Sequence, residues 1–336
     1  MTDQATVVAT RDGRIGRILL NRPKALNALD LSMIRACTAI LESWREDPHV
    51  DAVVIQGAGD RAFCAGGDIR VLRDGQMSGD RASVDRFFSE EYALNLTIAT
   101  YPKPYIALID GLCMGGGIGV SVHGPYRVAT DHAAFAMPET AIGFFPDVGA
   151  TFLLPRLPGE LGAYLGLTGL RLTGADAVHA GLATHFTPRA RLADLSAGLA
   201  RDGAVALATY NQTLPPFSLA GDLAAIGHCF SAETVREIVT RLESIRSGWA
   251  GAALKALRQV SPSALHWTLH ALRRGRDMTL KQALDMEFAL TRTVMAHPDF
   301  AEGVRAMVVD KDRAPAWLPA RIADVDPVKI HAQFNG

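Results

Sequence analysis

The chain has 336 residues, of which 49% are hydrophobic, so it is long enough for one large domain or for a domain with an extension. Its formal net charge is −1, which argues against the basic surface of a nucleic-acid-binding protein. The first residues lack the basic segment of a secretory signal, and the most apolar window, 106–122, is short for a membrane span. We therefore expect a soluble, cytoplasmic protein that binds neither nucleic acid nor a membrane.

Short strand and helix patterns alternate through the first part of the chain. Strand patterns lie at 6–10, 15–20, 52–56, 105–109, 128–129 and 135–136, and helical patterns lie at 31–45 and 87–99. Asp30 is the expected N-cap of the first helix. Alternation of this kind predicts an α/β fold with mainly parallel strand pairing.

The pattern becomes almost wholly helical after about Gly149. The segment 213–218 contains two adjacent prolines and is typical of a linker. Beyond it, amphipathic helices are expected at 232–247, 250–259, 263–274, 280–296 and 300–309, with helix starts near Ser231 and Pro262. We therefore divide the chain into a core at 1–212 and a helical C-terminal region at 213–336, and we expect the functional site in the core.

The four cysteines are widely scattered along the chain, at Cys37, Cys64, Cys113 and Cys229. They form neither a disulfide framework nor a Cys/His cluster with the spacing of metal ligands. We expect buried free thiols and no metal site.

Two acids, Glu139 and Asp147, stand out in the otherwise apolar segment 137–149. Two prolines and two glycines interrupt this segment, which predicts a fixed loop rather than a regular element. An acid in apolar surroundings costs free energy unless it is paired or hydrogen-bonded. Two such acids in one loop indicate acid/base chemistry, although helix capping or turn stabilisation would explain them equally well.

Two glycine clusters follow predicted strands, at 66–67 and at 115–117. Backbone N–H groups in such clusters can approach a ligand closely, and two of them aimed at one carbonyl oxygen would form an oxyanion hole. A packing turn is the alternative for each cluster. The glycines fit no phosphate-binding fingerprint, and the sequence GVSVH at 119–123 lacks the final glycine of a nucleophile elbow. Ser121 is therefore expected inside a helix.

Together these motifs resemble the crotonase (enoyl-CoA hydratase/isomerase) superfamily. The motifs are NRPKALNAL at 21–29, AFCAGGDI at 62–69 and GGG at 115–117, in the order and at the separations of that superfamily. The likeness covers about residues 6–186. Within the superfamily the chain is most similar to the 3-hydroxyisobutyryl-CoA hydrolases, through residues 90–92, 114–124, 137–149, 180–185 and 309–317.

The resemblance implies a fold, a reaction and roles for particular residues. The fold is a spiral of ββα units followed by a helical region, and superfamily members assemble as trimers or hexamers, a state left open for this chain. The reaction is hydrolysis of a short β-hydroxyacyl-CoA thioester, foremost 3-hydroxyisobutyryl-CoA in valine catabolism. Coenzyme A is then part of the substrate, and neither a cofactor nor a metal is implied. The implied catalytic residues are Gly67, Gly116, Glu139 and Asp147, and the implied substrate-binding residues are Glu91, Lys24, Ala25, Ala65, Asp68 and Ile69.

One departure from the superfamily bears on the reaction. Hydratases carry a second glutamate three residues after the oxyanion glycine, and here that position is Gly119. Addition of water across a double bond uses two carboxyl groups, so hydration would lack one of its catalysts. An isomerase or hydratase that uses Glu139 alone, and a non-catalytic acyl-CoA-binding or RNA-binding protein of the same fold, are the alternatives.

Overall fold

The computed structural model describes residues 5–334, which form two compact units. The first unit comprises the described residues within Met1–Gly67, Glu90–Phe135 and Leu172–Ser218. The second comprises those within Asp68–Ser89, Ala136–Arg171 and Leu219–Gly336. Each unit is therefore assembled from three segments that are distant in sequence. The predicted division between residues 212 and 213 follows chain order and stays a prediction.

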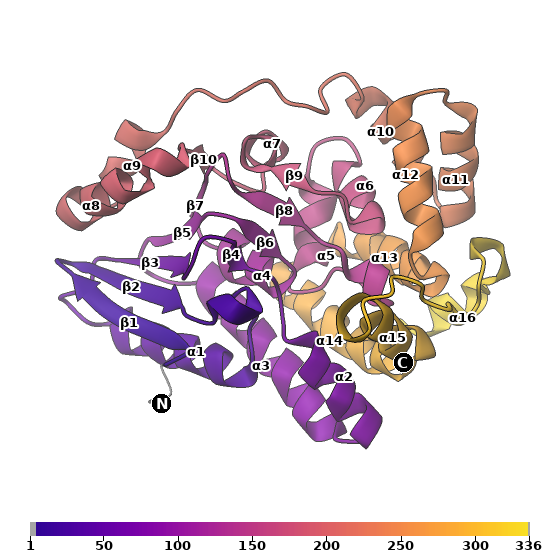
Figure 1. The fold of residues 1–336 in the computed structure, drawn as a ribbon, viewed down its shortest axis with the longest axis horizontal. Coiled ribbons are helices and arrows are strands. Elements are labelled where there is room, and N and C mark those ends of the chain that lie inside the picture. The colour runs from indigo at the N-terminus through magenta and orange to yellow at the C-terminus, as the bar shows by residue number, and fades with distance from the viewer. Residues whose placement is uncertain (1–4, 335–336) are drawn as a thin grey trace. The chain divides into compact units, whose positions relative to one another are not determined.

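A six-stranded sheet forms the centre of the first unit (Figure 1). Its strands, in spatial order, are β1 (Val7–Asp12), β2 (Ile15–Leu20), β3 (Ala52–Gly57), β5 (Tyr105–Ile109), β7 (Tyr126–Ala129) and β10 (His185–Phe186). Strands β1 and β2 form an antiparallel hairpin, and all other neighbours pair in parallel. The mainly parallel pairing that the sequence predicts is confirmed.

A second, four-stranded sheet has the order β4 (Ala62–Cys64), β6 (Leu112–Met114), β8 (Ala134–Ala136) and β9 (Leu172–Thr173). Strand β6 was not expected, because the 105–109 strand was predicted to run directly into the glycine turn. The structure inserts a turn at Gly111, which has a φ of +82°. A Cβ at this position would lie 2.5 Å from Arg61 O, so only glycine allows the chain to turn here and to form β6.

The helical segments of the first unit are α1 (Leu31–Arg45), the Glu90–Ala99 part of α3 (Arg81–Ala99), α4 (Gly116–Val122), α7 (Gly174–Ala180), α8 (Leu192–Asp202), α9 (Ala206–Tyr210) and the 3-10 turns η1 (Pro23–Ala25), η4 (Arg189–Arg191) and η5 (Gly203–Val205). The predicted cap of α1 is confirmed, since the Asp30 side chain accepts a hydrogen bond of 2.9 Å from Met33 N. Ser121 lies inside α4, as expected, and its hydroxyl donates to Gly117 O at 2.8 Å.

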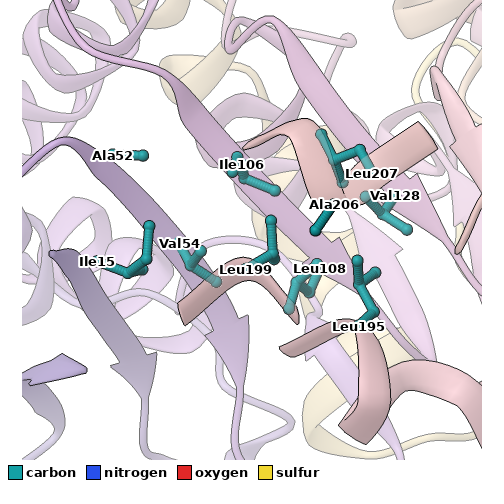
Figure 2. Close-up of a cluster of buried hydrophobic side chains, with 10 residues drawn as sticks. All are labelled: Ile15, Ala52, Val54, Ile106, Leu108, Val128, Leu195, Leu199, Ala206 and Leu207. Carbon is teal, nitrogen blue, oxygen red and sulfur yellow. The ribbon is translucent and has the colours of Figure 1, made fainter. Parts of the chain in front are cut away.

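Helices α8 and α9 are held on the six-stranded sheet by a hydrophobic cluster, shown in Figure 2. The sheet contributes Ile15, Ala52, Val54, Ile106, Leu108 and Val128, and the helices contribute Leu195, Leu199, Ala206 and Leu207. All ten side chains are buried. Because full burial of a leucine or isoleucine contributes about 1.5–3 kcal/mol, this cluster fixes the two helices to the sheet.

The second unit is helical. Its helices are α2 (Ile69–Ser78), the Arg81–Ser89 part of α3, α5 (Ala150–Leu153), α6 (Leu161–Thr168), α10 (Leu223–Phe230), α11 (Val235–Ser244), α12 (Gly248–Gln259), α13 (Pro262–Gly275), α14 (Leu280–Ala296), α15 (Pro298–Val304) and α16 (Pro327–Ala332). Short turns add η2 (Glu139–Ile142), η3 (Leu154–Arg156), η6 (Arg305–Val309, a π-helix) and η7 (Ile322–Asp324). Helix α13 carries the fully buried Trp267 and packs against α5, α6 and η2.

The expected helices of the C-terminal region are all found, with corrections at their ends. Ser231 does not start a helix; it is the C-cap of α10. Helix α11 begins after Thr234, whose side chain and that of Glu237 form a reciprocal capping box. The expected 300–309 helix begins earlier, at Pro298, and changes to a π-helix at Arg305.

Within residues 5–334, no helix is both long and apolar enough to cross a membrane. All four cysteines are buried free thiols, as expected. Burial raises the pKa of Cys37 and of Cys113 to about 12, so these thiols stay protonated and unreactive at neutral pH.

Candidate active site

The backbones of Gly67 and Gly116 meet in the first unit. Gly67 follows β4 and forms an isolated parallel bridge with Leu29, and Gly116 is the first residue of α4. A Cβ on Gly116 would lie 3.4 Å from Gly67 N. The N–H of Gly116 belongs to the first turn of a helix, which has no acceptor inside that helix. Within the described residues, neither N–H donates a backbone hydrogen bond outside the regular elements. Neither N–H is therefore taken up by a backbone acceptor of this kind in residues 5–334; that both bind one oxygen stays a prediction.

Glu91 lies directly beside these two donors. It is buried on α3, and a Cβ on Gly116 would overlap its Oε1 atom and lie 3.3 Å from Leu29 Cδ1. The absence of a side chain at Gly116 therefore makes room for the Glu91 carboxyl group. The Glu91 carboxyl group, which can accept hydrogen bonds, is therefore next to the backbone of Gly116.

The loop 137–149, which contains Glu139 and Asp147, lies in the second unit. The sequence predicted no regular structure in this loop, but part of it is helical. Residues Glu139–Ile142 form one turn of 3-10 helix, η2, which ends at Gly143 with a φ of +68°. Glu139 is 7% exposed and Asp147 is 6% exposed. Among residues 5–334, Glu139 Oε2 has no hydrogen-bond partner. A buried carboxyl oxygen without a partner is costly, and such groups gather at functional sites.

The electrostatic surroundings of Glu139 favour its neutral form. Burial raises the pKa of Glu139 well above its ordinary value, and the negative charge of Asp147 raises it further. Two acids that repel each other in this way can divide the roles of proton donor and acceptor. The pair can therefore perform acid/base chemistry.

Helices from the C-terminal part of the chain fix the first half of the acid loop. Ser261 N, at the start of α13, donates to Thr140 O at 3.1 Å. A Cβ on Gly143 would overlap the carbonyl oxygen of Asp299, and one on Gly303 would lie 2.5 Å from the carbonyl carbon of Ile142. The backbone of η2 thus packs against α15 without intervening side chains, which limits the freedom of Glu139.

Comparison with known proteins now identifies the family. A model of the enoyl-CoA hydratase/isomerase family matches residues 15–334. The chain belongs to this family. It is 46% identical to the mitochondrial 3-hydroxyisobutyryl-CoA hydrolase of Xenopus tropicalis, over 97% of this chain and 88% of that protein.

Two solved structures of the family match nearly the whole chain. One is described as a carnitinyl-CoA dehydratase from Mycobacterium thermoresistibile, with a TM-score of 0.95, 38% identity, and coverage of 98% of this chain and 96% of that one. The other is described as an enoyl-CoA hydratase from Rhodobacter sphaeroides 2.4.1, with a TM-score of 0.93, 41% identity, and coverage of 98% and 97%. The crotonase-like α/β fold expected from the sequence is confirmed.

The family motif at 21–29 has a structural function in this member. Asn27 is fully buried, and its Nδ2 atom donates to Ala58 O and Ala62 O, both at 2.9 Å. These bonds hold the segment that contains Lys24 and Ala25 close to the strand β4. Ala65 N donates to Leu26 O at 3.0 Å, which brings a third predicted substrate-binding residue to the same place.

The remaining predicted substrate-binding residues, Asp68 and Ile69, are at the start of α2 in the second unit. Asp68 is the N-cap residue of this helix, and its side chain makes no capping hydrogen bond. The predicted site residues are therefore divided between the units. Lys24, Ala25, Ala65, Gly67, Glu91 and Gly116 belong to the first unit, and Asp68, Ile69, Glu139 and Asp147 belong to the second.

One acid near Asp147 was missed by the sequence analysis. Glu287 is fully buried on α14, and its carboxyl group binds the chain just after Asp147. The other buried residues of α14 are Ala283, Leu284, Leu290, Thr291, Val294 and Met295. Position 287 falls within their helical periodicity, so an acid in the apolar stripe was a signal that could have been recognised.

Proposed function

We propose that this family member is an acyl-CoA thioester hydrolase that converts 3-hydroxyisobutyryl-CoA to 3-hydroxyisobutyrate and CoA, a step of valine catabolism. The carrying observation is the pair of buried, mutually repelling acids, Glu139 and Asp147, in a chain that has glycine at position 119. The relative from Xenopus tropicalis bears the name of this activity and matches the chain over nearly its whole length, which supports the proposal.

In the proposed mechanism, the N–H groups of Gly67 and Gly116 bind the thioester oxygen and stabilise its negative charge in the tetrahedral intermediate. Glu139 either removes a proton from the attacking water or attacks the thioester carbon to give a mixed anhydride, which water then hydrolyses. The C–S bond breaks in both routes, and the CoA thiolate leaves and is protonated. Asp147 orients the substrate hydroxyl or assists proton transfer.

The substrate-binding roles are proposed in the same way. Glu91, beside the two N–H donors, would accept a hydrogen bond from the substrate hydroxyl. The CoA moiety would lie along the exposed η1 turn, with Lys24 near its phosphates and Ala25 beside it. Ala65, Asp68 and Ile69 complete the proposed set.

Release of free thiol tests the proposed reaction. Purified protein is expected to liberate CoA from 3-hydroxyisobutyryl-CoA at a rate that scales with protein concentration, and to leave most of the enoyl absorbance of crotonyl-CoA unchanged. The second substrate matters because the two solved relatives are described as a hydratase and a dehydratase. Thiol release at the rate of the protein-free control would refute hydrolysis, and a loss of enoyl absorbance without thiol release would favour hydration.

The pH dependence of the reaction is expected to change in the Asp147→Asn variant. The charge of Asp147 raises the pKa of Glu139, so its removal lowers that pKa. Glu139 must lose its proton to act as a base or a nucleophile. The acidic limb of kcat/KM, normalised to its maximum and measured from about pH 5 to 9, should therefore move to lower pH. An unchanged limb, or one at higher pH, would contradict the assigned interaction.

The compartment and the assembly are proposals of the same kind. We propose a cytoplasmic location and a trimer or hexamer without nucleic acid or membrane as partner. The named relative from Xenopus tropicalis is mitochondrial, so fractionation of the source cells distinguishes the two locations. Light scattering of the purified protein gives the number of subunits.

A further inference from the structure

Glu287 binds the acid loop through three hydrogen bonds. Its Oε2 atom accepts from Gly149 N at 2.8 Å, and its Oε1 atom accepts from Thr151 N at 3.0 Å and from Thr151 Oγ1 at 2.6 Å. All three donors lie within four residues of Asp147. Through these bonds a single side chain of α14 holds the turn between Asp147 and helix α5.

That turn has an unfavourable backbone conformation. Val148 has a φ of +54° and Gly149 a φ of +83°, so two consecutive residues are left-handed. Glycine adopts this conformation freely, whereas a β-branched residue such as valine rarely does. Strain of this kind persists only where surrounding contacts impose it, and it gathers at functional sites. The bonds from Gly149 N and Thr151 N to Glu287 are contacts that impose it here.

An acid at position 287 is itself unfavourable for stability. Burial raises the pKa of Glu287 to about 8; the bonds from Thr151 oppose this rise, and the charge of Asp147 adds to it. An apolar side chain at this point of the stripe would avoid the cost of burying a carboxyl group. Core packing therefore does not explain the carboxyl group at position 287, which points to another role for this residue.

The turn that Glu287 binds also includes the backbone of Asp147. Ala150 N donates to Asp147 O at 2.8 Å, so the backbone of Asp147 belongs to the same hydrogen-bonded turn. Capping the first turn of α5 would be a purely structural role for Glu287, because α5 has only four residues and no side-chain cap of its own. A fixed first turn, however, also fixes the position from which the Asp147 side chain projects.

We infer that Glu287 is a positioning residue for Asp147. The carboxyl group of Glu287 holds the turn at 147–151 in the conformation that catalysis requires. This inference rests on the proposed hydrolase function. It assigns Glu287 no contact with the substrate.

The test compares variants of the whole protein in the thiol-release assay. Glu287→Gln keeps one acceptor oxygen but presents an NH2 group to the N–H donors of the turn. Because a displacement of about 1 Å can cost 10²-fold in rate, we expect kcat to fall roughly 10- to 100-fold while KM changes less than about threefold. Asp285→Asn, an exposed acid-to-amide change on the same helix, is the matched control and should keep the wild-type kcat.

A double-mutant cycle separates positioning of Asp147 from a general structural effect. If Glu287 acts through Asp147, the change Glu287→Gln should add little to the loss already caused by Asp147→Asn. Should Glu287→Gln fail to fold, Thr151 provides the test. Thr151→Val removes the hydroxyl donor and should lower kcat, whereas Thr151→Ser keeps the donor and should restore it.

The inference would be overturned by a folded Glu287→Gln variant with wild-type kcat. It would also be overturned if the loss of kcat in Glu287→Gln added fully to the loss in Asp147→Asn. If Glu287→Gln does not fold, equal kcat values for Thr151→Val and Thr151→Ser would overturn it. Absence of thiol release from the wild-type protein would instead refute the proposed function, so the two failures are distinguishable.

Discussion

Replacement of Glu139 by glutamine is expected to lower kcat for thioester hydrolysis by about 10²–10⁴-fold, the usual contribution of a positioned general base or acid. Glutamine has nearly the same size as glutamate but neither removes a proton from water nor attacks a thioester. The measurement is thiol release at saturating 3-hydroxyisobutyryl-CoA. Glu233→Gln, which changes an exposed acid of the same unit, should retain the wild-type rate. A Glu139→Gln variant within threefold of wild type would mean that another group performs the chemistry.

The same variant should also differ from wild type in stability. The folded protein keeps a proton on Glu139 between the ordinary pKa of 4.5 and the raised value, whereas the unfolded chain loses it. The free energy of unfolding of the wild type therefore falls as pH rises through this window. Glutamine has no such proton, so urea unfolding should show the variant gaining stability relative to wild type as pH rises. A relative loss of stability would contradict the raised pKa.

Replacement of Gly116 by alanine keeps the backbone N–H but is expected to lower kcat by about 10²–10³-fold, a loss of the size that removal of one oxyanion donor causes, because the added methyl group obstructs the space in front of the donors. The new methyl group would overlap Glu91 Oε1 and would lie 3.4 Å from Gly67 N. Glu91 must then move, and the methyl group enters the space beside both donors. The loss should appear in kcat for 3-hydroxyisobutyryl-CoA, measured by thiol release.

A glycine on another helix provides the control for this prediction. A Cβ on Gly251, in α12, would meet no atom of residues 5–334 within 4 Å apart from the neighbouring backbone of its own helix. Gly251→Ala should therefore keep the wild-type kcat and gain up to about 1 kcal/mol from helix propensity. If Gly116→Ala and Gly251→Ala had the same activity, the thioester oxygen could not lie in the space beside Gly116 that the new methyl group fills.

Periodicity predicted several of the longer elements, but it gave no range for α2 or α8 and began α3 at residue 87 instead of Arg81. The limits of α1, β5 and α14 agree with the sequence expectations. Strands β9 and β10 were missed because two residues contain no period, and their position is decided by the strands beside them. The interleaved units could not be foreseen either, because local patterns say nothing about which distant segments pack together.

The candidate site was predictable where it depends on family motifs. The two acids of the loop 137–149 and the two glycine clusters stood out by their local patterns, and the family motifs implied catalytic roles for Gly67, Gly116, Glu139 and Asp147; these roles stay predictions. Glu287 was missed because an acid on an amphipathic helix is usually assigned to the exposed face. Only the three-dimensional structure shows its partners, which lie 136 and 138 residues earlier in the chain.

This long separation has a consequence for the order of folding. The hairpin β1–β2 and the capped helices form from neighbouring residues, whereas the turn at Asp147 is completed only when α14 reaches it. Closing so large a loop costs entropy before any contact compensates for it, and contacts of high sequence separation slow folding. During synthesis, both acids leave the ribosome about 140 residues before the helix that fixes their loop. Catalytic competence should therefore be among the last properties that the nascent chain acquires.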